Sequence, residues 1–303
     1  MVAFARTVAK PAPRRWLSRR DWTPDLLLAP ALVAIAAVMG FPLLYLVYMS
    51  VHKWSLIGDA APVFVGAGNF TALVEDDRFL QSLFRTLYFT AAGLATNLPA
   101  GLGIALLLNR EFFGRNVLRA LLIFPIVATP VAMGLVWVVM LDPSLGVVRY
   151  MFGLVGVVNP PLWLSDTDWV IPTLVLVDAW MWTPMVALIC SAGLAALPVE
   201  PFEAATVDGA SAWQRFRYLT LPLLMPMLLV ATMLRLMDLL KVIDIIYVMT
   251  GGGPGQASET INLYNYLVAL SYDKIGYGAA VALVLFILVL LTTLGLVRLR
   301  RAA

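Results

Sequence analysis

Charged side chains recur at every third position from 235 to 244, inside and just beyond a long apolar run. The row reads Arg235, Asp238, Lys241 and Asp244, with alternating sign. Residues three apart on a helix are neighbours, so consecutive members could form ion pairs. Each step also drifts about 60° around a helix, which predicts that Arg235 and Asp244 lie on opposite sides. Polar groups in such a run either pair structurally or contact a ligand, and we favour structural pairing.

A second cluster combines a carboxylate with aromatic rings. Asp178 lies in another apolar run, together with Trp180 and Trp182. Aromatic faces cover the C–H surface of a sugar, and carboxylates accept its hydroxyl protons, so this mixture suits a sugar. Tryptophan is also common at membrane interfaces, and a purely structural role is the favoured alternative. The candidate substrate path comprises Asn97, Asp178, Trp182, Arg235, Asp238 and Tyr247.

Motifs for bond-making chemistry are missing from the sequence. It contains no phosphate loop ending in Gly-Lys-Ser/Thr, no HExxH and no nucleophile elbow. One cysteine (Cys190) excludes a disulfide framework within the chain, and with one histidine (His52) it argues against a structural zinc site. We therefore expect a non-enzymatic chain that carries no cofactor of its own.

The composition indicates a membrane protein with several spans. Of 303 residues, 61% are hydrophobic and 13% charged, whereas soluble domains have about 45–50% apolar and about 25% charged residues. A helix needs about 20 mostly apolar residues to cross a bilayer. Six runs qualify, and they are Leu26–Met49, Leu83–Leu108, Ala120–Leu141, Trp169–Ser191, Leu221–Leu240 and Ile275–Val297. None alternates like a barrel strand, so the predicted fold is all-α and integral to the membrane. Pro42 should kink the first span.

Basic residues orient the predicted spans. Fourteen Lys and Arg residues flank the spans on one side and five on the other, which predicts that both termini are cytoplasmic. The chain then divides into a basic tail (1–25), a six-helix domain (26–297) and a second tail (298–303). Because the basic residues cluster beside spans, the sequence gives no support for a nucleic-acid partner. Arg85, near the outer end of its span, is expected to snorkel to the interface.

Two external or cytoplasmic stretches should form short helices. "SLGVVRYMFGLVG", residues 144–156, is predicted to be a short interfacial helix. "EAATVDGASAWQRFRYLTLP", Glu203–Pro222, faces the cytoplasm by the charge count. Pro201 marks a helix start, Gly209 a left-handed cap, and Ser211 with Gln214 a capping box that opens a second helix. A first helix this short is marginal alone, so it either docks on a partner or forms a solvated elbow on its own protein.

The Glu203–Pro222 stretch resembles the cytoplasmic loop of permease subunits in binding-protein-dependent ABC importers. The matching positions are Glu203, Ala204 and Ala205, then Asp208, Gly209 and Ala210, then Phe216, and finally Leu221 and Pro222. Leu219 departs from the pattern, since isoleucine is commoner there. "IYVMTGGGPGQASETINLYNY", residues 246–266, resembles the segment after the fifth span in carbohydrate-uptake permeases of the maltose, trehalose and glycerol-phosphate type. "LLIFPIVATPVAMGLVW" and "PLWLSD" resemble these permeases as well.

The resemblance implies a type I ABC importer permease that takes up a mono-, di- or oligosaccharide across the bacterial cytoplasmic (inner) membrane. It implies three partners: a second homologous permease, a dimer of ATP-binding subunits that carries ATP and Mg, and an extracytoplasmic substrate-binding protein. Within the loop 198–222, the residues that would couple to the ATPase are Glu203, Ala204, Ala205, Asp208 and Gly209. We expect a heterodimer of permeases, with a homodimer as the alternative. The competing functions are a glycerol-phosphate or sugar-alcohol importer and a self-contained secondary transporter.

Overall fold

The fold is described from a computed structural model, which describes residues 23–58, 61–157 and 159–302. Residues 1–22 of the predicted basic tail therefore lie outside the described residues. The chain divides into two compact units, residues 1–45 and residues 46–303. In the first unit, α1 (Thr23–Ile35) leads through the π-helical turn η1 (Ala36–Gly40) into α2 (Phe41–Ser50), within which the first unit ends.

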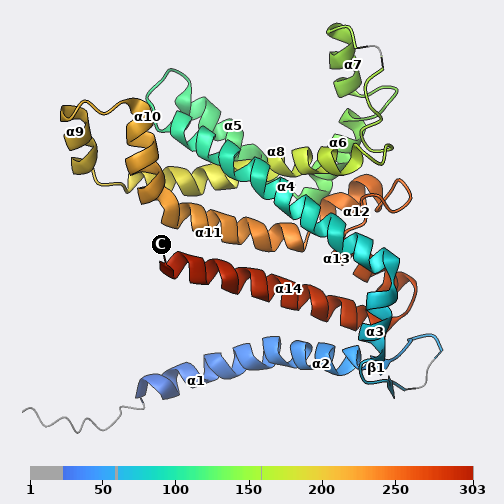
Figure 1. The fold of residues 1–303 in the computed structure, drawn as a ribbon. Helices are drawn as coiled ribbons and strands as arrows, with labels where there is room; N and C mark the ends of the chain where they lie inside the picture. Colours follow the sequence, from blue (N-terminus) through green and yellow to red (C-terminus); the bar gives the residue numbers. More distant parts are fainter. Residues whose placement is uncertain (1–22, 59–60, 158, 303) are drawn as a thin grey trace, which may run out of the picture. The chain divides into compact units, whose positions relative to one another are not determined.

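The second unit is built almost entirely from helices (Figure 1). Its long helices are α4 (Asp77–Leu108), α8 (Val170–Ala195), α11 (Leu221–Leu240) and α14 (Ile275–Ala302). The shorter ones are α3 (Gly68–Glu75), α5 (Arg115–Val127), α6 (Pro130–Met140), α7 (Val147–Leu154), α9 (Glu200–Val207), α10 (Ala212–Arg215), α12 (Asp244–Thr250) and α13 (Ile261–Tyr266), with π turns η2 (Phe216–Thr220) and η3 (Leu267–Ser271). Strands β1 (His52–Lys53) and β2 (Val63–Phe64) form one antiparallel pair. The helix predicted in residues 144–156 is confirmed as α7.

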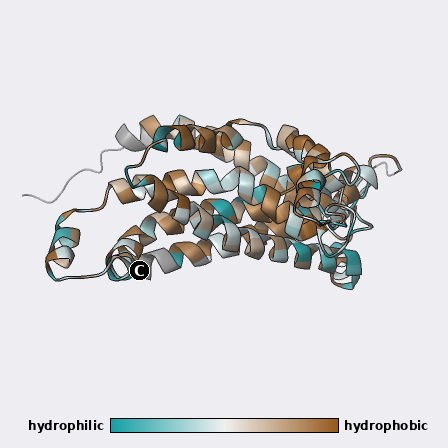
Figure 2. Ribbon diagram, turned by 90° about the horizontal axis from the view of Figure 1, so that it is seen from above, coloured by the Kyte–Doolittle hydropathy of each residue, from teal (hydrophilic) through white to brown (hydrophobic). Residues whose placement is uncertain are grey.

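Among the described residues, five helices are long and apolar enough to cross a membrane, and a bent pair brings that number to six if it counts as one span. The five are Leu27–Ser50, Asp77–Leu108, Val170–Ala195, Ala212–Leu240 and Ile275–Arg298. In Figure 2 the long helices are mostly brown, the colour of apolar residues. The predicted C-terminal tail from residue 298 continues α14 as helix as far as Ala302.

The third predicted span, Ala120–Leu141, is not one helix. It forms α5 and α6, whose axes bend by 104° at the break between them. Thr129 is extended, with ψ of 140°, and its hydroxyl caps the backbone N–H of Ala132. The residue before a proline avoids the helical region, so α5 ends and α6 begins anew at Pro130. The predicted third span therefore consists of two helices joined by a sharp bend.

Two prolines are accommodated by π-helical turns. The turn η1 ends two residues before Pro42, and η2 ends two residues before Pro222. A proline ring clashes with the carbonyl four residues earlier and cannot donate to it, and a wider π turn separates the two groups. The expected disruption at Pro42 thus takes the form of a local π turn. Because η2 joins α10 to α11, residues 212–240 form one continuous helix of 29 residues.

Small residues let α4 pack closely against α8 and α11, which lie beside it in Figure 1. A Cβ atom on Gly93 would lie 2.7 Å from Leu239 of α11, and one on Gly101 would lie 2.5 Å from Val186 of α8. Glycine at such positions allows helix backbones to approach, which is the usual source of packing energy between membrane helices. The α4–α8 pair is therefore the centre of the bundle.

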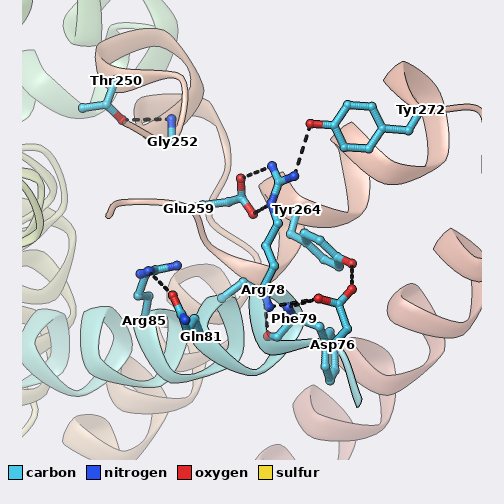
Figure 3. A network of polar contacts seen from close by, with 11 residues as sticks. Asp76, Arg78, Phe79, Gln81, Arg85, Thr250, Gly252, Glu259, Tyr264 and Tyr272 are labelled. Carbon is cyan, nitrogen blue, oxygen red and sulfur yellow. Dashed lines mark hydrogen bonds and ion pairs between the residues drawn. The ribbon is translucent and has the colours of Figure 1, made fainter. Parts of the chain in front are cut away.

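Polar contacts tie the start of α4 to the C-terminal third of the chain (Figure 3). Asp76 caps α4 by accepting from the N–H groups of Arg78 and Phe79, and its other oxygen accepts from the hydroxyls of Tyr264 (2.5 Å) and Tyr277 (2.7 Å). Arg78 binds both oxygens of the buried Glu259 side chain, at 2.8 and 2.7 Å. A fork of this kind is stronger than a single hydrogen bond.

Replacing Gly101 by alanine should destabilise the second unit by about 1–3 kcal/mol, because the added methyl group overlaps Val186. Gly103 lies two residues away on α4, and a Cβ atom added there would meet nothing within 4 Å. Gly103→Ala should therefore be neutral or stabilise by up to about 1 kcal/mol through helix propensity. Thermal unfolding of both variants in detergent measures the difference, and equal melting temperatures would contradict the close packing.

Asp76 should make stability depend on pH. Burial alone would raise the pKa of this carboxyl group, but hydrogen bonds from Tyr264, Tyr277 and two backbone N–H groups hold it below its ordinary value of 3.8. A lowered folded-state pKa contributes stability that is present above the ordinary pKa and is lost as the pH falls through the folded-state value. The difference in melting temperature between wild type and Asp76→Asn should shrink on acidification below about pH 4. Asp77→Asn is the matched control, since no side-chain hydrogen bond of Asp77 occurs among the described residues.

Candidate functional site

Four side chains from three helices meet inside the second unit. Asn97 comes from α4, Asp178 and Trp182 from α8, and Arg235 from α11. Asp178 and Trp182 share a helix face because they are four residues apart. Asn97, Asp178 and Arg235 are at most 2% exposed. A polar cluster this deep must satisfy its own charges and hydrogen bonds.

An ion pair between Asp178 and Arg235 holds the cluster together. Arg235 Nη2 lies 2.5 Å from Asp178 Oδ2, and Asn97 Nδ2 donates to the same oxygen at 3.1 Å. Asn97 also donates to the carbonyl of Gly93 at 2.7 Å, and Thr183 donates to its amide oxygen at 3.4 Å. The guanidinium carbon lies 5.3 Å from the centre of the Trp182 ring, within the range of a cation–π contact. Arg235 Nε, which is buried, has no acceptor among the described residues.

A pocket of about 310 Å³ opens beside this ion pair. Asp178, Trp182 and Arg235 form its inner wall. The remaining lining residues are Pro130, Asp238, Lys241, Val242, Ile243, Asp244 and Ile245. Its size falls at the lower end of small-molecule sites, which measure about 300–1,000 Å³. The structure therefore joins the two polar clusters that the sequence presents separately.

The row of charges from 235 to 244 does not run along one helix. The helix α11 ends at Leu240, and Asp244 begins α12. The prediction that Arg235 and Asp244 lie on opposite sides was wrong, because the chain turns between them and both line the same pocket. Only one of the expected local ion pairs occurs among the described residues, between Lys241 and Asp238 at 3.8 Å, with both side chains about half exposed. Arg235 pairs across helices instead.

Tyr247 does not line the pocket. It is 51% exposed on α12, and its ring packs edge-on against Tyr266 at 5.5 Å. Within the part of the chain that the structure describes, no group of three or more His, Cys, Asp or Glu side chains could hold a metal ion. The five other candidate path residues either form the buried cluster or line the pocket beside it.

The segment from 200 to 215 forms two short helices joined at Gly209, at the polar end seen on the left of Figure 2. Gly209 has φ of +77°, and the N–H groups of Gly209 and Ala210 donate to the carbonyls of Thr206 and Ala205. This is a Schellman motif, in which glycine is favoured because it tolerates a positive φ. The predicted left-handed cap is confirmed.

The second helix starts as the sequence indicated. Ser211 and Gln214 form a reciprocal capping box, with hydrogen bonds of 2.7 and 3.3 Å. A further contact was not predicted: Arg215 Nη1 donates to Thr206 Oγ1 at 2.9 Å and so fixes the angle between α9 and α10. Conversely, α9 buries none of its own residues, and Val207 is 88% exposed.

The coupling residues implied by the resemblance lie on this exposed helix and its cap. Glu203, Ala204, Asp208 and Gly209 are exposed, and Ala205 is half-buried. Glu203 lies in the first turn of α9, where the helix dipole favours an acid. An exposed surface with two small residues and two acids is available to a partner.

The structure is a helical bundle with a charged pocket between its helices and an exposed helical loop at one end. The chain matches, over residues 97–302, the family described as "Binding-protein-dependent transport system inner membrane component". The chain belongs to this family.

Relatives with assigned names are similar along most of the chain. The "Trehalose/maltose transport system permease protein MalF" of Thermococcus litoralis is 36% identical over 271 residues, covering 89% of this chain and 90% of the relative. The "Sulfoquinovosyl glycerol transport system permease protein SmoG" of Agrobacterium fabrum is 34% identical over 293 residues, covering 96% and 95%.

A solved structure shares the fold. A chain from a bacterial ABC transporter involved in the import of the acidic polysaccharide alginate superposes with a TM-score of 0.80 at 22% identity, covering 93% of this chain and 96% of that one. The predicted resemblance to ABC importer permeases is confirmed by these comparisons.

Arg235→Met should destabilise the chain by about 3–5 kcal/mol, because it leaves the Asp178 carboxylate buried without its cation. The double variant Asp178→Asn, Arg235→Met removes both charges and should recover most of that loss. Thermal unfolding in detergent, together with the yield of folded protein, measures both effects.

Lys241→Met is the control for this comparison. Its half-exposed partner Asp238 lies 3.8 Å away, so the change should stay within about 0.5 kcal/mol. A double variant as unstable as Arg235→Met alone would show that the ion pair is not what compensates Asp178.

Proposed function

We propose that the chain is the permease subunit of an ATP-driven importer that takes up a sugar across the cytoplasmic membrane. The observation that carries this proposal is the pocket beside Asp178, Trp182 and Arg235, which combines an aromatic face with buried hydrogen-bonding groups. Sugars offer apolar C–H faces and hydroxyl groups to such a site. The names of the trehalose/maltose and trehalose permeases among its relatives support the same class of cargo.

A neutral sugar fits this pocket better than a phosphate ester. The positive charge of Arg235 is already balanced by Asp178, and Lys241 is paired with Asp238. Asp244 on the same wall leaves the pocket with more acidic than basic side chains. An anionic cargo would have to replace an existing partner of Arg235. The free Nε–H of Arg235 can instead donate to a neutral hydroxyl oxygen.

Transport by this chain requires energy from a partner. We assign α9, from Glu203 to the Gly209 cap, to contact with an ATP-binding subunit on the cytoplasmic side. The exposed surface of α9 supports this assignment, because a helix of 8 residues is marginal without a partner surface. ATP and Mg would be held by that partner. Both termini would then be cytoplasmic, in line with the excess of Lys and Arg in the same loops.

Two further partners complete the proposed importer. A second, homologous permease would enclose the pathway together with this chain, as a heterodimer. An extracytoplasmic binding protein would deliver the sugar. The family description supports such a partner, because it names binding-protein-dependent transport. A bacterial alginate transporter of the same fold has been solved with its periplasmic protein bound, and that arrangement supports the assignment.

The test is uptake by the complete importer, reconstituted with its binding protein, over a panel of labelled disaccharides, monosaccharides, polyols and glycerol 3-phosphate. Wild type should accumulate a neutral sugar only with ATP. Glu203→Ala and Gly209→Val should lower uptake about tenfold or more, since a branched residue at a positive φ is strained by about 1–3 kcal/mol. Accumulation of glycerol 3-phosphate alone would replace the sugar by the phosphate ester as cargo.

Gly114→Val is the matched control for Gly209→Val. Gly114 also has a positive φ, of 86°, with open space around its Cβ position, but it precedes α5 and lies outside the proposed coupling loop. It should strain the backbone equally and leave uptake near the wild-type rate. Uptake that persists without ATP in the wild type would favour a self-contained transporter.

A further inference from the structure

Arg85 carries a positive charge that forms no ion pair within the described part of the protein. Its Nη2 donates to Gln81 Oε1 at 2.8 Å, while Nη1 is buried and has no acceptor among the described residues. No carboxylate in the described part of the chain forms an ion pair with it. Glu259, drawn near it in Figure 3, is held at both oxygens by Arg78. One guanidinium nitrogen of Arg85 is therefore left without an acceptor among the described residues.

The arginine lines a pocket of about 670 Å³ that lies outside the proposed sugar site. The walls of this pocket come from α4, from the start of α8 and from one residue of the 251–260 segment. They comprise Leu80, Gln81, Phe84, Arg85, Tyr88, Thr167, Asp168, Ile171, Pro172 and Ala257. Cation and anion thus face the same space from different elements.

Asp168 is the anion of this pocket. It is exposed just before α8, and no hydrogen bond or ion pair of its carboxylate occurs among the described residues. Arg85 and Asp168 do not form a salt bridge with each other, so both charges are available to a ligand. A ligand that carries both signs satisfies the two side chains together.

An apolar stripe continues from the pocket along α4. Leu80, Phe84, Tyr88, Ala91 and Ala95 are all exposed, and their spacing of three or four residues places them on one face. The large side chains line the pocket, and the two alanines extend the exposed apolar face beyond it. An amphiphile could place its polar end in the pocket and its chain along this stripe.

We propose that this pocket binds the headgroup of a zwitterionic phospholipid with a primary ammonium group. The phosphate pairs with Arg85, the ammonium with Asp168, and an acyl chain lies along the α4 stripe. A guanidinium matches phosphate geometry well. A soluble anion would leave the stripe uncovered. An acidic partner protein would leave Asp168 without a cation.

The test is native mass spectrometry of the complete importer, released from detergent with equal amounts of phosphatidylethanolamine and phosphatidylglycerol. Wild type should retain the ethanolamine lipid on the order of fivefold over the glycerol lipid, because only the former brings an ammonium group to Asp168. Asp168→Asn should lower this ratio towards one while phosphate binding persists. Arg85→Gln should lose both lipids.

Two variants control for folding and for net charge. Arg110→Gln removes the same charge just beyond the other end of α4 and should leave the lipid ratio unchanged. Arg85→Lys keeps the charge without the fork, and should retain lipid to an intermediate degree if Arg85→Gln proves too unstable to purify. Equal lipid retention by wild type and Arg85→Gln would overturn the proposal. So would an ethanolamine preference that survives Asp168→Asn, or its absence in the wild type.

Discussion

The ion pair between Asp178 and Arg235 constrains the packing of the whole bundle. Two charges removed from water are compensated only when their geometry is tight and the remaining donors and acceptors are filled. The helices α8 and α11 must lie close enough for Arg235 Nη2 to reach Asp178 Oδ2, at 2.5 Å. The helix α4 supplies Asn97 as a second donor to the same oxygen. Gly93, Asn97 and Gly101 follow one another at steps of four on α4, so the close backbone contacts lie directly beside the polar one. Packing and charge compensation thus depend on the same stripe.

The two ends of the bundle are stabilised differently. At one end, contacts between residues far apart in sequence are dense: Arg78 with Glu259, Asp76 with two tyrosines, and Asp273 with the hydroxyl and backbone N–H groups of 55–57. At the other end, no residue of α9 is buried, and the helix is held by local caps and by Arg215. The first end is fixed by the chain itself, whereas the second leaves an ordered surface for another protein.

Local signals in the sequence predicted local structure well. The apolar runs gave the long helices, Gly209 gave the left-handed cap, and Ser211 with Gln214 gave the capping box, because each depends on neighbours within a few residues. The proline at position 130 is a local signal of the same kind for the bend between α5 and α6. The prediction gave more weight to the length of the apolar run than to this proline. The Asp178–Arg235 pair could not be derived from spacing, since it joins separate helices. The only sign of this pair in the sequence is that one span contains an acidic residue and another contains a basic residue.

The predicted fifth span ends at Leu240, where α11 ends, but the turn that follows was not predicted, because no glycine or proline marks it. Lys241 and Val242 could continue a helix, and the chain leaves it because Asn262 and Thr260 bond the carbonyls of Lys241 and Val242. The two carbonyl groups thus accept hydrogen bonds from residues some twenty positions later and not from within a continued helix. A turn stabilised from that distance leaves no local pattern, which is why Asp244 was expected on the wrong side.

The unbroken helix from Ala212 to Leu240 has a mechanical consequence. Arg235 lies 14 residues beyond Leu221, about 20 Å along the axis at 1.5 Å per residue. A tilt of about 10° around the Pro222 region would swing the guanidinium by roughly 3–4 Å, given that axial length. That displacement exceeds the 2.5 Å that separates Arg235 from Asp178. The helix is therefore long enough to serve as a lever, through which a small rotation at the loop 198–222 would be sufficient to open the ion pair.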